Sequence, residues 1–390
     1  MKILVVHNKY QSKNIGGEDI VYEDEVLSLQ SELGKENVLS YEVKNDDLTK
    51  LKLIFNILFS IKYYKDIKKI VIENDINIVH VHNFFPFLSP SIFKAAKKGG
   101  AKVVHTLHNY RFWCISGTFY RDGYGVCEIC TRSRFSLQGI LSKCFRKSLF
   151  QSVVAQFSFW FYRSSKIFDN IDYFFVLTNF QKEKIKSLGV EERKIIIKPN
   201  GFQVLESPQN KKDGYIFVGR SEEFKGLLIL LDVWSKLDKK FVLTIIGTRN
   251  NEEKLKKYYQ SSNIIFKHVL SREDTMSNIS KAKYLIQSSI GYETFGLTII
   301  EAMSYGVPVI GFDIGTRREF IKNNVNGFLC EKQKLEDTIK KSFNFHEYET
   351  LSKNALLDSK EFDNSFVVKK QIKIYENMID PSYIRVSTYE

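Results

Sequence analysis

Short apolar runs alternate with helical patterns along almost the whole chain, and this alternation predicts two α/β domains. In the first half, the apolar runs lie at residues 2–6, 76–82, 101–108, 173–178 and 194–201. A second cycle follows, with runs at residues 214–219, 241–247, 263–269, 282–289 and 307–313. Strands that alternate with helices form parallel sheets with helices on both faces. We therefore expect two doubly wound, Rossmann-like domains whose sheets face each other across a cleft.

The domain boundary is predicted at a polar stretch, residues 199–213, which contains Pro199 and Pro208. We expect an N-terminal domain over residues 1–198 and a C-terminal domain over residues 199–364. The remaining residues, 365–390, begin with a helical pattern that we expect to pack back towards the N-terminal domain. A length of 390 residues is too great for one compact core and agrees with two domains.

Composition and charge narrow the class of protein. The N-terminal run turns polar at His7, too early for a secretory signal, and Lys or Arg interrupts every run that approaches a bilayer span. We therefore expect a soluble, cytoplasmic protein. The net charge is +13, yet residues 50–168 alone hold 19 Lys and Arg against 5 Asp and Glu. Such concentration indicates an anionic partner: a membrane surface, a nucleic acid or a phosphorylated substrate.

The first candidate site is the segment YETFGLTIIEAMSYGVPVIGFD, residues 292–313. Glu293 precedes a turn at Gly296, and Glu301 lies in an apolar helix, where a carboxylate is costly unless it is hydrogen-bonded. Glu301 can accept two hydrogen bonds from a vicinal diol such as that of a ribose. The backbone N–H groups at Gly296–Thr298 favour a phosphate. A nucleoside diphosphate satisfies both features, whereas a capping group or a solvated helix face is the alternative.

The second candidate site is FVGRSEEFKG, residues 217–226, directly after a predicted strand. Arg220 and Lys225 flank a turn at the carboxyl end of the second sheet. Two cations at such a turn can neutralise a diphosphate and stabilise it as a leaving group. Two ordinary surface cations are the alternative, and the neighbouring phosphate-type turn argues against it.

Together, the GR…KG turn, the two glutamates separated by seven residues and the EAM continuation resemble the retaining glycosyltransferases of family 4, which have the GT-B fold. Residues 79–114, LTNFQKEKI (177–185) and KPNG (198–201) are similar to a bacterial surface-polysaccharide assembly subgroup with a four-cysteine N-terminal insertion, here residues 111–147. The resemblance covers nearly the whole chain. Two departures, Thr294 after the first glutamate and the absence of a proline before the loop, bear on the sugar rather than on the reaction.

The resemblance implies a role for each matching residue. Glu301 would hold the ribose hydroxyls, Glu293 the donor sugar, and Arg220 and Lys225 the diphosphate. The other donor-binding positions implied are Gly16, Gly17, Gly219, Phe295, Gly296, Leu297 and Thr298. His108, at the end of a predicted strand, matches the family's cleft histidine near the donor sugar and joins Glu293, Arg220 and Lys225 as a catalytic candidate. By themselves, a glycine pair is usually a turn and a histidine is usually structural.

The reaction implied by the resemblance is sugar transfer from a UDP- or GDP-sugar to a hydroxyl with retention of anomeric configuration. The leaving phosphate would help to deprotonate the acceptor, so catalysis would consist mainly of positioning and charge stabilisation. No catalytic metal is expected, because no Asp-x-Asp lies at a suitable turn and the residues 23–25, Glu-Asp-Glu, fall in a helical pattern.

Four of the five cysteines fall within 31 residues, as C-x12-C-x2-C-x13-C. This spacing of Cys114, Cys127, Cys130 and Cys144 is typical of a structural zinc site, and a cytoplasmic location argues against disulfides. Four ordinary cysteines are the alternative.

Two basic segments mix cations with large apolar residues, residues 50–70 and 145–166. Both could be amphipathic helices at an anionic membrane surface, or ordinary core helices with a solvated lysine face. We expect a peripheral protein on the inner face of the cell membrane, acting on a lipid-linked saccharide acceptor.

Three other functions remain open at this point. A nucleic-acid-binding protein would use the basic segments and the cysteines but leave the second domain without a role, so no nucleic acid is expected. A nucleotide-sugar epimerase of the same fold is disfavoured by the GR…KG turn and the glutamate spacing. A phosphorylase is disfavoured because no lysine stands out as an attachment site for pyridoxal phosphate.

Overall fold

The computed structural model describes residues 1–9, 16–44, 56–203, 212–248, 252–259 and 261–380. The chain forms two compact units. Unit 1 comprises Met1–Phe119, Cys127–Gly201 and Asn364–Glu390, and unit 2 comprises Tyr120–Val126 and Phe202–Asp363. Each unit contains a parallel sheet of six strands, so the predicted α/β class with two doubly wound domains is confirmed. None of the helices within the described ranges has the length and apolar character needed to cross a bilayer.

The sheet of unit 1 has the strand order β2-β1-β3-β4-β7-β8. Its strands are β1 (Ile3–Lys9), β2 (Val38–Lys44), β3 (Ile78–Asn83), β4 (Lys102–Thr106), β7 (Tyr173–Val176) and β8 (Ile195–Ile197). The central strand β1 pairs with β2 from Ile3–Val38 onward and with β3 from Ile3–Ile78 onward. Because β1 and β3 are buried on both faces, their side chains are apolar or hydrogen-bonded throughout.

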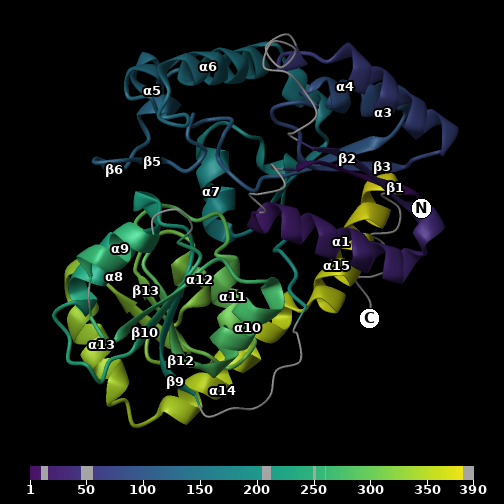
Figure 1. The fold of residues 1–390 in the computed structure, drawn as a ribbon. Helices are drawn as coiled ribbons and strands as arrows, with labels where there is room; N and C mark the ends of the chain where they lie inside the picture. Colours follow the sequence, from purple (N-terminus) through teal and green to yellow (C-terminus); the bar gives the residue numbers. More distant parts are fainter. Residues whose placement is uncertain (10–15, 45–55, 204–211, 249–251, 260, 381–390) are drawn as a thin grey trace. The chain divides into compact units, whose positions relative to one another are not determined.

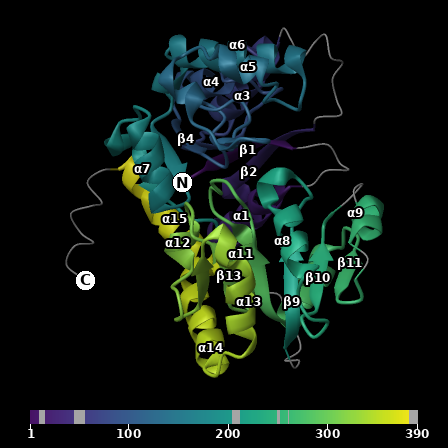
Figure 2. The same ribbon diagram turned by 90° about the vertical axis from the view of Figure 1, so that its left-hand side faces the viewer.

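Helices cover both faces of this sheet. Helices α3 (Ile61–Glu73) and α4 (Ser91–Gly99) lie on one face, whereas α1 (Gly17–Leu33) and α15 (Asn364–Ile379) lie on the other (Figure 1). Helices α5 (Leu137–Leu141) and α6 (Leu149–Ser164) pack against each other (Figure 2), and α7 (Asn179–Ser187) precedes β8. Hydroxyl caps begin several of them: Ser148 Oγ accepts from Gln151 N in α6, and Thr178 Oγ1 accepts from Gln181 N in α7.

The sheet of unit 2 has the order β11-β10-β9-β12-β13-β14. Its strands are β9 (Asp213–Val218), β10 (Leu243–Ile246), β11 (Ile264–Lys267), β12 (Ala282–Gln287), β13 (Val309–Phe312) and β14 (Gly327–Cys330). Its core is built around Trp234, Tyr215 and Tyr284, and the Trp234 indole N–H donates to the carbonyl of Phe241 at 2.8 Å.

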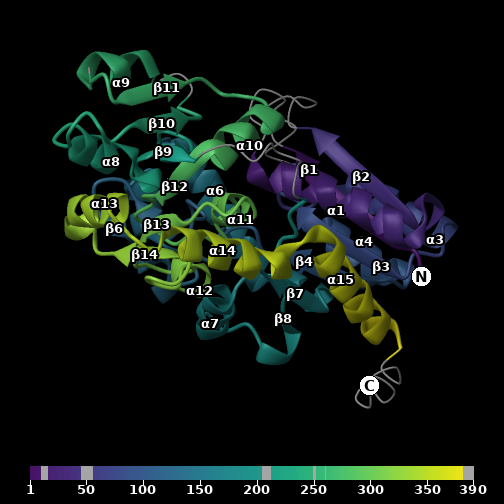
Figure 3. The same ribbon diagram turned by 90° about the horizontal axis from the view of Figure 1, so that it is seen from below.

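The helices of unit 2 also lie on both faces of its sheet. Helices α8 (Leu227–Trp234) and α13 (Leu335–Phe343) pack together on one side (Figure 3). Helix α11 (Leu297–Met303) packs against α10 (Arg272–Lys281) and α14 (Tyr348–Ser359) on the other. The remaining helices are α9 (Glu252–Tyr258) and α12 (Arg317–Phe320).

Two strands, β2 and β14, were not predicted from the sequence. Each lies at an edge of its sheet. Strand β2 has an interrupted burial pattern, and β14 is largely buried but has only four residues and begins with Gly327, so its apolar run is short. The boundaries that were predicted, 198/199 and 364/365, compare with divisions at 201/202 and 363/364 in the structure. Most of the predicted linker, residues 204–211, and residues 50–55 of the first basic segment lie outside the described residues.

The insertion at residues 111–147, predicted as part of the first domain, is divided between the two units. Its hairpin, β5 (Tyr120–Arg121) and β6 (Gly125–Val126), belongs to unit 2. The reason is a set of contacts to η5 (Glu223–Lys225), in which the Tyr120 and Phe224 rings meet edge to face at 5.6 Å.

Candidate functional site

The two predicted motifs of unit 2 are joined by their backbones. They follow the neighbouring strands β9 and β12, whose carboxyl ends lie at the same edge of the sheet. The Ile290 N–H donates to the Phe224 carbonyl at 2.9 Å, and Ser288 Oγ donates to the Lys225 carbonyl at 3.0 Å. This approach requires glycine at position 226, where φ is +68° and a Cβ atom would lie 1.9 Å from the Ser288 carbonyl oxygen.

The joined loops bring Lys225 and Glu293 into an ion pair. Lys225 Nζ lies 2.7 Å from Glu293 Oε1, and the Ser289 hydroxyl donates to the same oxygen at 2.7 Å. Burial raises the pKa of Glu293, but Lys225, Ser289 and Arg317 outweigh that effect and hold the pKa below its ordinary value. Glu293 is therefore ionised near neutral pH, and it fixes the position of the Lys225 ammonium.

Arg317 is a functional candidate that the sequence analysis missed. It begins α12, is completely buried, and donates through Nε to the Phe312 carbonyl at 2.8 Å. A second contact, from Nη2 to the Gly291 carbonyl at 3.3 Å, supports the loop that carries Glu293. Burial lowers the pKa of Arg317 to about 10, so the side chain stays charged at neutral pH. Only its position after β13, in the motif GTRRE, could have drawn attention to it.

Arg220 and Gly219 follow β9 but differ from Lys225 in their surroundings. Arg220 is exposed and lies 3.1 Å from the Glu222 carboxylate. Gly219 is in contact with Gly247, where a Cβ atom would lie 2.9 Å from the Gly219 carbonyl oxygen. Arg220 is thus a surface cation at the carboxyl edge of the sheet, available to a ligand that reaches that edge.

The turn into α11 holds the remaining candidates of unit 2. Gly296 adopts a left-handed conformation with φ +94° directly before Leu297, the first residue of the helix, and the Gln287 amide donates to Thr298 Oγ1 at 3.2 Å. Glu301 is buried in the same helix. The Phe295 side chain is a core residue that packs edge to face on Phe320 and Phe362, so Phe295 could reach a ligand only through its backbone.

The hairpin β5–β6 supports the loop that carries Lys225. Glu223 Oε1 accepts hydrogen bonds from the Tyr120 hydroxyl at 2.7 Å and from the Gly123 N–H at 2.9 Å. Gly291, from the Glu293 loop, lies against both Phe224 and Tyr120, and a Cβ atom there would lie 2.4 Å from the Phe224 ring. Three segments distant in the sequence therefore meet around η5.

In unit 1, a buried carboxylate organises the histidines. Glu25 of α1 accepts from His82 Nε2 at 3.2 Å, from His80 Nδ1 at 2.9 Å and from the Gln371 amide at 2.6 Å, and it pairs with Lys198 through its other oxygen. Burial raises the pKa of Glu25, but Lys198 and the two histidines outweigh it and hold that pKa well below its ordinary value. The network ties β3, the end of β8 and α15 to α1.

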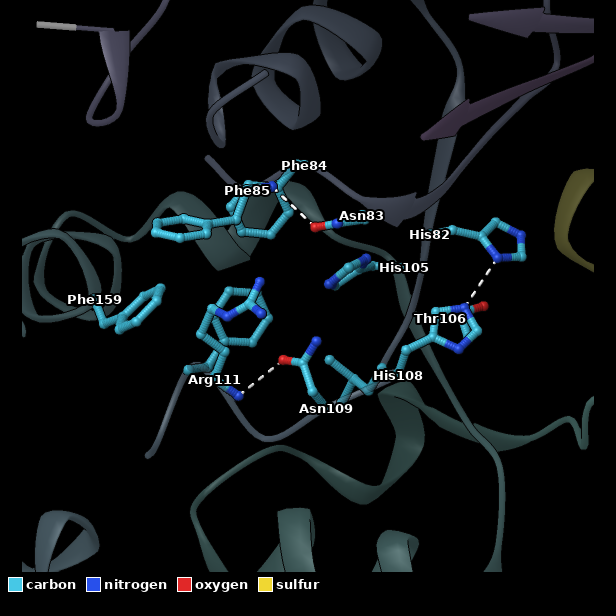
Figure 4. Close-up of a pocket in the computed structure, with 12 residues that line it drawn as sticks. His82, Asn83, Phe84, Phe85, His105, Thr106, His108, Asn109, Arg111 and Phe159 are labelled. Carbon is cyan, nitrogen blue, oxygen red and sulfur yellow. Dashed lines mark hydrogen bonds between the residues drawn. The ribbon is translucent and has the colours of Figure 1, made fainter. Parts of the chain in front are cut away.

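His108 is the last member of this network. His82 Nδ1 lies 3.0 Å from His108 Nε2, and the two rings are stacked 5.1 Å apart (Figure 4). Burial lowers the pKa of His82 to about 3, so His82 is neutral and donates from Nε2 to the ionised Glu25. His82 Nδ1 then accepts from His108 Nε2–H, which leaves His108 Nδ1 as an acceptor, because burial also holds the pKa of His108 well below its ordinary value.

His108 borders a pocket at the carboxyl ends of β3 and β4. One side is aromatic, with Phe84, Phe85 and Phe159, and the Arg111 guanidinium lies over the Phe85 ring at 5.0 Å (Figure 4). The pocket thus combines an aromatic wall, a cation and an imidazole.

Gly16 and Gly17 begin α1 after β1. The Gly16 N–H donates to Asp19 Oδ2 at 3.0 Å, and Asp19 Oδ1 lies 2.8 Å from His7 Nε2. The His7–Asp19 pair was not predicted; His7 is the fifth residue of β1, within a run of buried side chains, and its sequence context resembles a plain buried strand.

Among the described residues, the one group arranged to hold a metal ion is Glu25, His80 and His82. The Lys198 ammonium already neutralises this carboxylate, and a second cation beside it would be repelled. We therefore regard this group as a hydrogen-bonded network.

The four cysteines of the insertion are reduced and lie in unit 1. Burial raises the pKa of the Cys130 thiol, and the nearby Cys114 and Cys127 thiols add to that rise, so three of the four lie near one another. Cys114 Sγ is 3.1 Å from Ser116 Oγ. Within the described part of the chain these thiols do not form a metal-ligand group, and the zinc site stays a prediction.

Comparison with known proteins assigns both halves of the chain. Residues 33–204 match the domain model described as Glycosyltransferase Family 4, and residues 202–355 match the model described as Glycosyl transferases group 1. An uncharacterized glycosyltransferase of Haemophilus influenzae is 28% identical, and the alignment covers 41% of this chain and 46% of that relative. The O-antigen chain mannosyltransferase C of Escherichia coli is 26% identical, and the alignment covers 42% of this chain and 45% of that relative. The chain spans about half the length of these curated relatives.

The fold agrees with solved structures of the same type. Anabaena HepE, crystallised in complex with UDP, superposes with a TM-score of 0.67 over 97% of this chain and 100% of HepE, at 16% sequence identity. The predicted GT-B architecture is therefore confirmed as a fold.

Tyr120→Phe tests the support that the hairpin gives to η5. Without the hydroxyl, the exposed Glu223 carboxylate loses one of its two donors, and we expect unit 2 to lose about 0.5–1.5 kcal/mol of stability. Hydrogen–deuterium exchange of residues 222–226 should speed up. Tyr124→Phe is the matched control, because Tyr124 lies on the same hairpin, is exposed and stacks under Arg121 at 3.9 Å. Equal exchange in both variants would contradict the assigned role of Tyr120.

Unit 1 should lose stability as the pH falls from about 6.5 to 4. His82 and His105 have pKa values of about 3 and about 4 in the folded state, below the ordinary 6.5, so down to about pH 5 almost only the unfolded chain takes up protons. Each histidine should cost about 1.6 kcal/mol between pH 6.5 and 5. Urea unfolding at both pH values measures the loss.

His105→Asn provides the check on this pH dependence. The amide can replace the 2.7 Å hydrogen bond from His105 Nδ1 to the Val81 carbonyl, but it does not titrate. The acid-induced loss should shrink in this variant and remain unchanged in His346→Asn, which alters an exposed histidine. An unchanged loss in both variants would show that His105 is not responsible.

Proposed function

We propose that this chain, a GT-B protein in which a glycosyltransferase family 4 domain precedes a group 1 glycosyl transferase domain, is a retaining glycosyltransferase. It moves a sugar from a UDP- or GDP-sugar to a hydroxyl of a saccharide acceptor in cell-surface polysaccharide synthesis. The O-antigen relative supports the saccharide acceptor, and the UDP complex of the structural neighbour supports the nucleotide donor.

The observation that carries the proposal is the Lys225–Glu293 pair at the carboxyl edge of the second sheet. A donor sugar-diphosphate needs a cation for the phosphates and hydrogen-bonding groups for the sugar hydroxyls, side by side. Here a single pair of joined loops provides both, with Arg317 buried behind Glu293. The neutralised carboxylate can accept from hydroxyls without repelling the diphosphate, since Lys225 balances its charge.

The donor is assigned to the residues of unit 2 as follows. Lys225 and the exposed Arg220 bind the diphosphate, together with backbone amides at Gly296, Leu297 and Thr298. Glu301 accepts from the ribose hydroxyls. Gly219 and the backbone of Phe295 line the donor. In unit 1, the resemblance to family 4 proposes Gly16, Gly17 and His108 as further donor-binding candidates.

The transfer needs no enzymic nucleophile. The acceptor oxygen forms a bond to the anomeric carbon on the face from which the diphosphate leaves, the carbon–oxygen bond to the β-phosphate breaks, and the acceptor proton passes to the departing phosphate oxygen. Lys225 and Arg220 stabilise the charge that develops on the diphosphate, a role that a metal ion has in other transferases. Retention follows because attack and departure share one face.

The acceptor is proposed to be lipid-linked, at the cytoplasmic face of the cell membrane. The excess of cations in residues 50–168 supports this, since both a lipid diphosphate and an anionic membrane attract positive charge.

Nucleotide binding tests the proposal directly. Titration calorimetry with UDP and GDP should show binding of one of them to the wild-type chain. Glu301→Gln should weaken it roughly tenfold, because an amide replaces a carboxylate that accepts two hydrogen bonds, and Lys225→Met should weaken it by roughly tenfold to a hundredfold. Glu273→Gln and Lys236→Met, both exposed, are the matched controls.

Sugar release from nucleotide sugars should be lost in Glu301→Gln and Lys225→Met, while their thermal unfolding stays close to that of the wild type. Wild-type activity in either variant would remove the site assignment. Binding of an oligonucleotide without binding of UDP or GDP would replace the transferase with a nucleic-acid-binding protein.

We also propose a structural zinc ion held by Cys114, Cys127, Cys130 and Cys144. Purified protein should contain about one equivalent of zinc, since tetrahedral thiolate sites bind it tightly. Cys127→Ser should lose the metal and become more sensitive to proteolysis within residues 111–147. Cys330→Ser, which changes the fifth cysteine in β14 of unit 2, should retain it. Well under one equivalent in the wild type would contradict the proposal.

A further inference from the structure

Helix α6 turns a large part of its apolar surface outward, although Ala155, Phe159 and Tyr162 are buried. Its buried positions include Ser152, Gln156 and Ser158, all at most 2% exposed. Its exposed positions include Leu149, Phe150, Val153 and Phe157, which are 43–65% exposed. These four lie at helical spacings that place them on one face. A helix that packs on a core normally shows the opposite arrangement.

The buried serines of α6 are hydrogen-bonded. Ser152 Oγ accepts from the Phe145 N–H at 3.0 Å, and Ser158 Oγ donates to the Val154 carbonyl at 2.7 Å. Phe159 and Tyr162 fill the core on the same side, where Phe159 packs against Phe85 at 5.2 Å. The polar groups are therefore satisfied inside, and the apolar face is left for another occupant.

The exposed face continues onto α5. Trp160 links the two, since its ring lies 5.5 Å from Phe157 and 6.2 Å from Phe135. In α5, which packs against α6, Leu137 and Leu141 are 66% and 70% exposed and lie four residues apart (Figure 2). We call these residues the α5–α6 face: Phe135, Leu137, Leu141, Leu149, Phe150, Val153, Phe157 and Trp160.

The segment that carries this face is strongly basic. Residues 129–168 contain no Asp or Glu between the flanking Glu128 and Asp169, whereas their cations are Arg132, Arg134, Lys143, Arg146, Lys147, Arg163 and Lys166. Six of the seven are exposed, all except Arg163. Exposed aromatic and aliphatic side chains on a segment with a large excess of cations match the interface of a bilayer that contains anionic lipids.

The first basic segment of the sequence, residues 50–70, does not share this arrangement. Its described part forms α3, which buries Tyr63, Ile67 and Val71 beside α4 and turns its lysines outward. Helix α3 is thus an ordinary amphipathic core helix. Helix α3 exposes the large apolar side chains Ile61 and Ile72, which lie near its two ends, whereas the exposed apolar residues of α6 form a continuous face.

We propose that the α5–α6 face docks on the surface of an anionic lipid bilayer, with its Phe, Leu and Trp side chains in the interface and its cations on the headgroups. A second copy of the chain is a poorer occupant, because two such faces would bring their cations together. This assignment does not depend on sugar transfer, since its readout is lipid binding alone.

Co-sedimentation with vesicles tests the docking. The full chain should bind vesicles with about 30% phosphatidylglycerol far better than pure phosphatidylcholine, and added salt should weaken binding. Phe150→Ser/Phe157→Ser should reduce the partition coefficient at least ~tenfold. Leu27→Ser/Phe366→Ser removes two exposed apolar side chains from α1 and α15 and should leave it unchanged.

A matched pair of charge variants separates this face from net charge. Arg146→Glu/Lys147→Glu should abolish most binding, whereas Lys65→Glu/Lys69→Glu, the same charge change on α3, should have a small effect. Equal loss in both would overturn the assignment. So would equal binding to neutral and anionic vesicles, or a dimer in light scattering that Phe150→Ser/Phe157→Ser dissociates, which would identify a second copy as the occupant.

Discussion

The ion pair between Lys225 and Glu293 is the interaction on which the proposed donor site depends. A carboxylate as buried as Glu293 must have donors, and Lys225, Ser289 and the nearby Arg317 satisfy it. The lysine in turn can reach the carboxylate only because Gly226 lets two loops pack backbone to backbone. The chemistry proposed for the site therefore follows from a packing constraint.

Unit 1 also contains a buried carboxylate, Glu25, whose charge is satisfied by donors from several elements. The Glu25 carboxylate forms an ion pair with Lys198 and accepts hydrogen bonds from two uncharged histidines. These contacts connect α1 to β3, and the hydrogen bond from Gln371 connects it to α15. The chain of hydrogen bonds from Glu25 through His82 to His108 fixes which nitrogen of His108 carries the proton. Glu25 and His82 can therefore set the protonation of His108 without contacting a ligand themselves.

Sequence reasoning reached the fold through periodicity, because buried parallel strands are apolar along their whole length. It missed the edge strands β2, whose burial pattern is interrupted, and β14, which is only four residues long. In the site, it named Lys225 and Glu293 from local motifs, but not their contact, nor Arg317 or Tyr120. These depend on segments far apart in sequence, such as the 2.7 Å hydrogen bond from Tyr120 to Glu223. It also assigned Phe295 to the donor, where burial against Phe320 makes its side chain part of the core. The exposed apolar face of α6 could not be predicted either, because the sequence shows which residues share a helix face but not whether that face is buried or exposed.

The discontinuous composition of unit 1 has a consequence for synthesis on the ribosome. Its sheet is complete once β8 has been made, yet Val368, Tyr375 and Met378 of α15 belong to its core, and Gln371 is a partner of Glu25. More than 150 residues of unit 2 are translated in between. The nascent first unit must therefore wait, with the surface that α15 will cover still open, until the last helix leaves the exit tunnel.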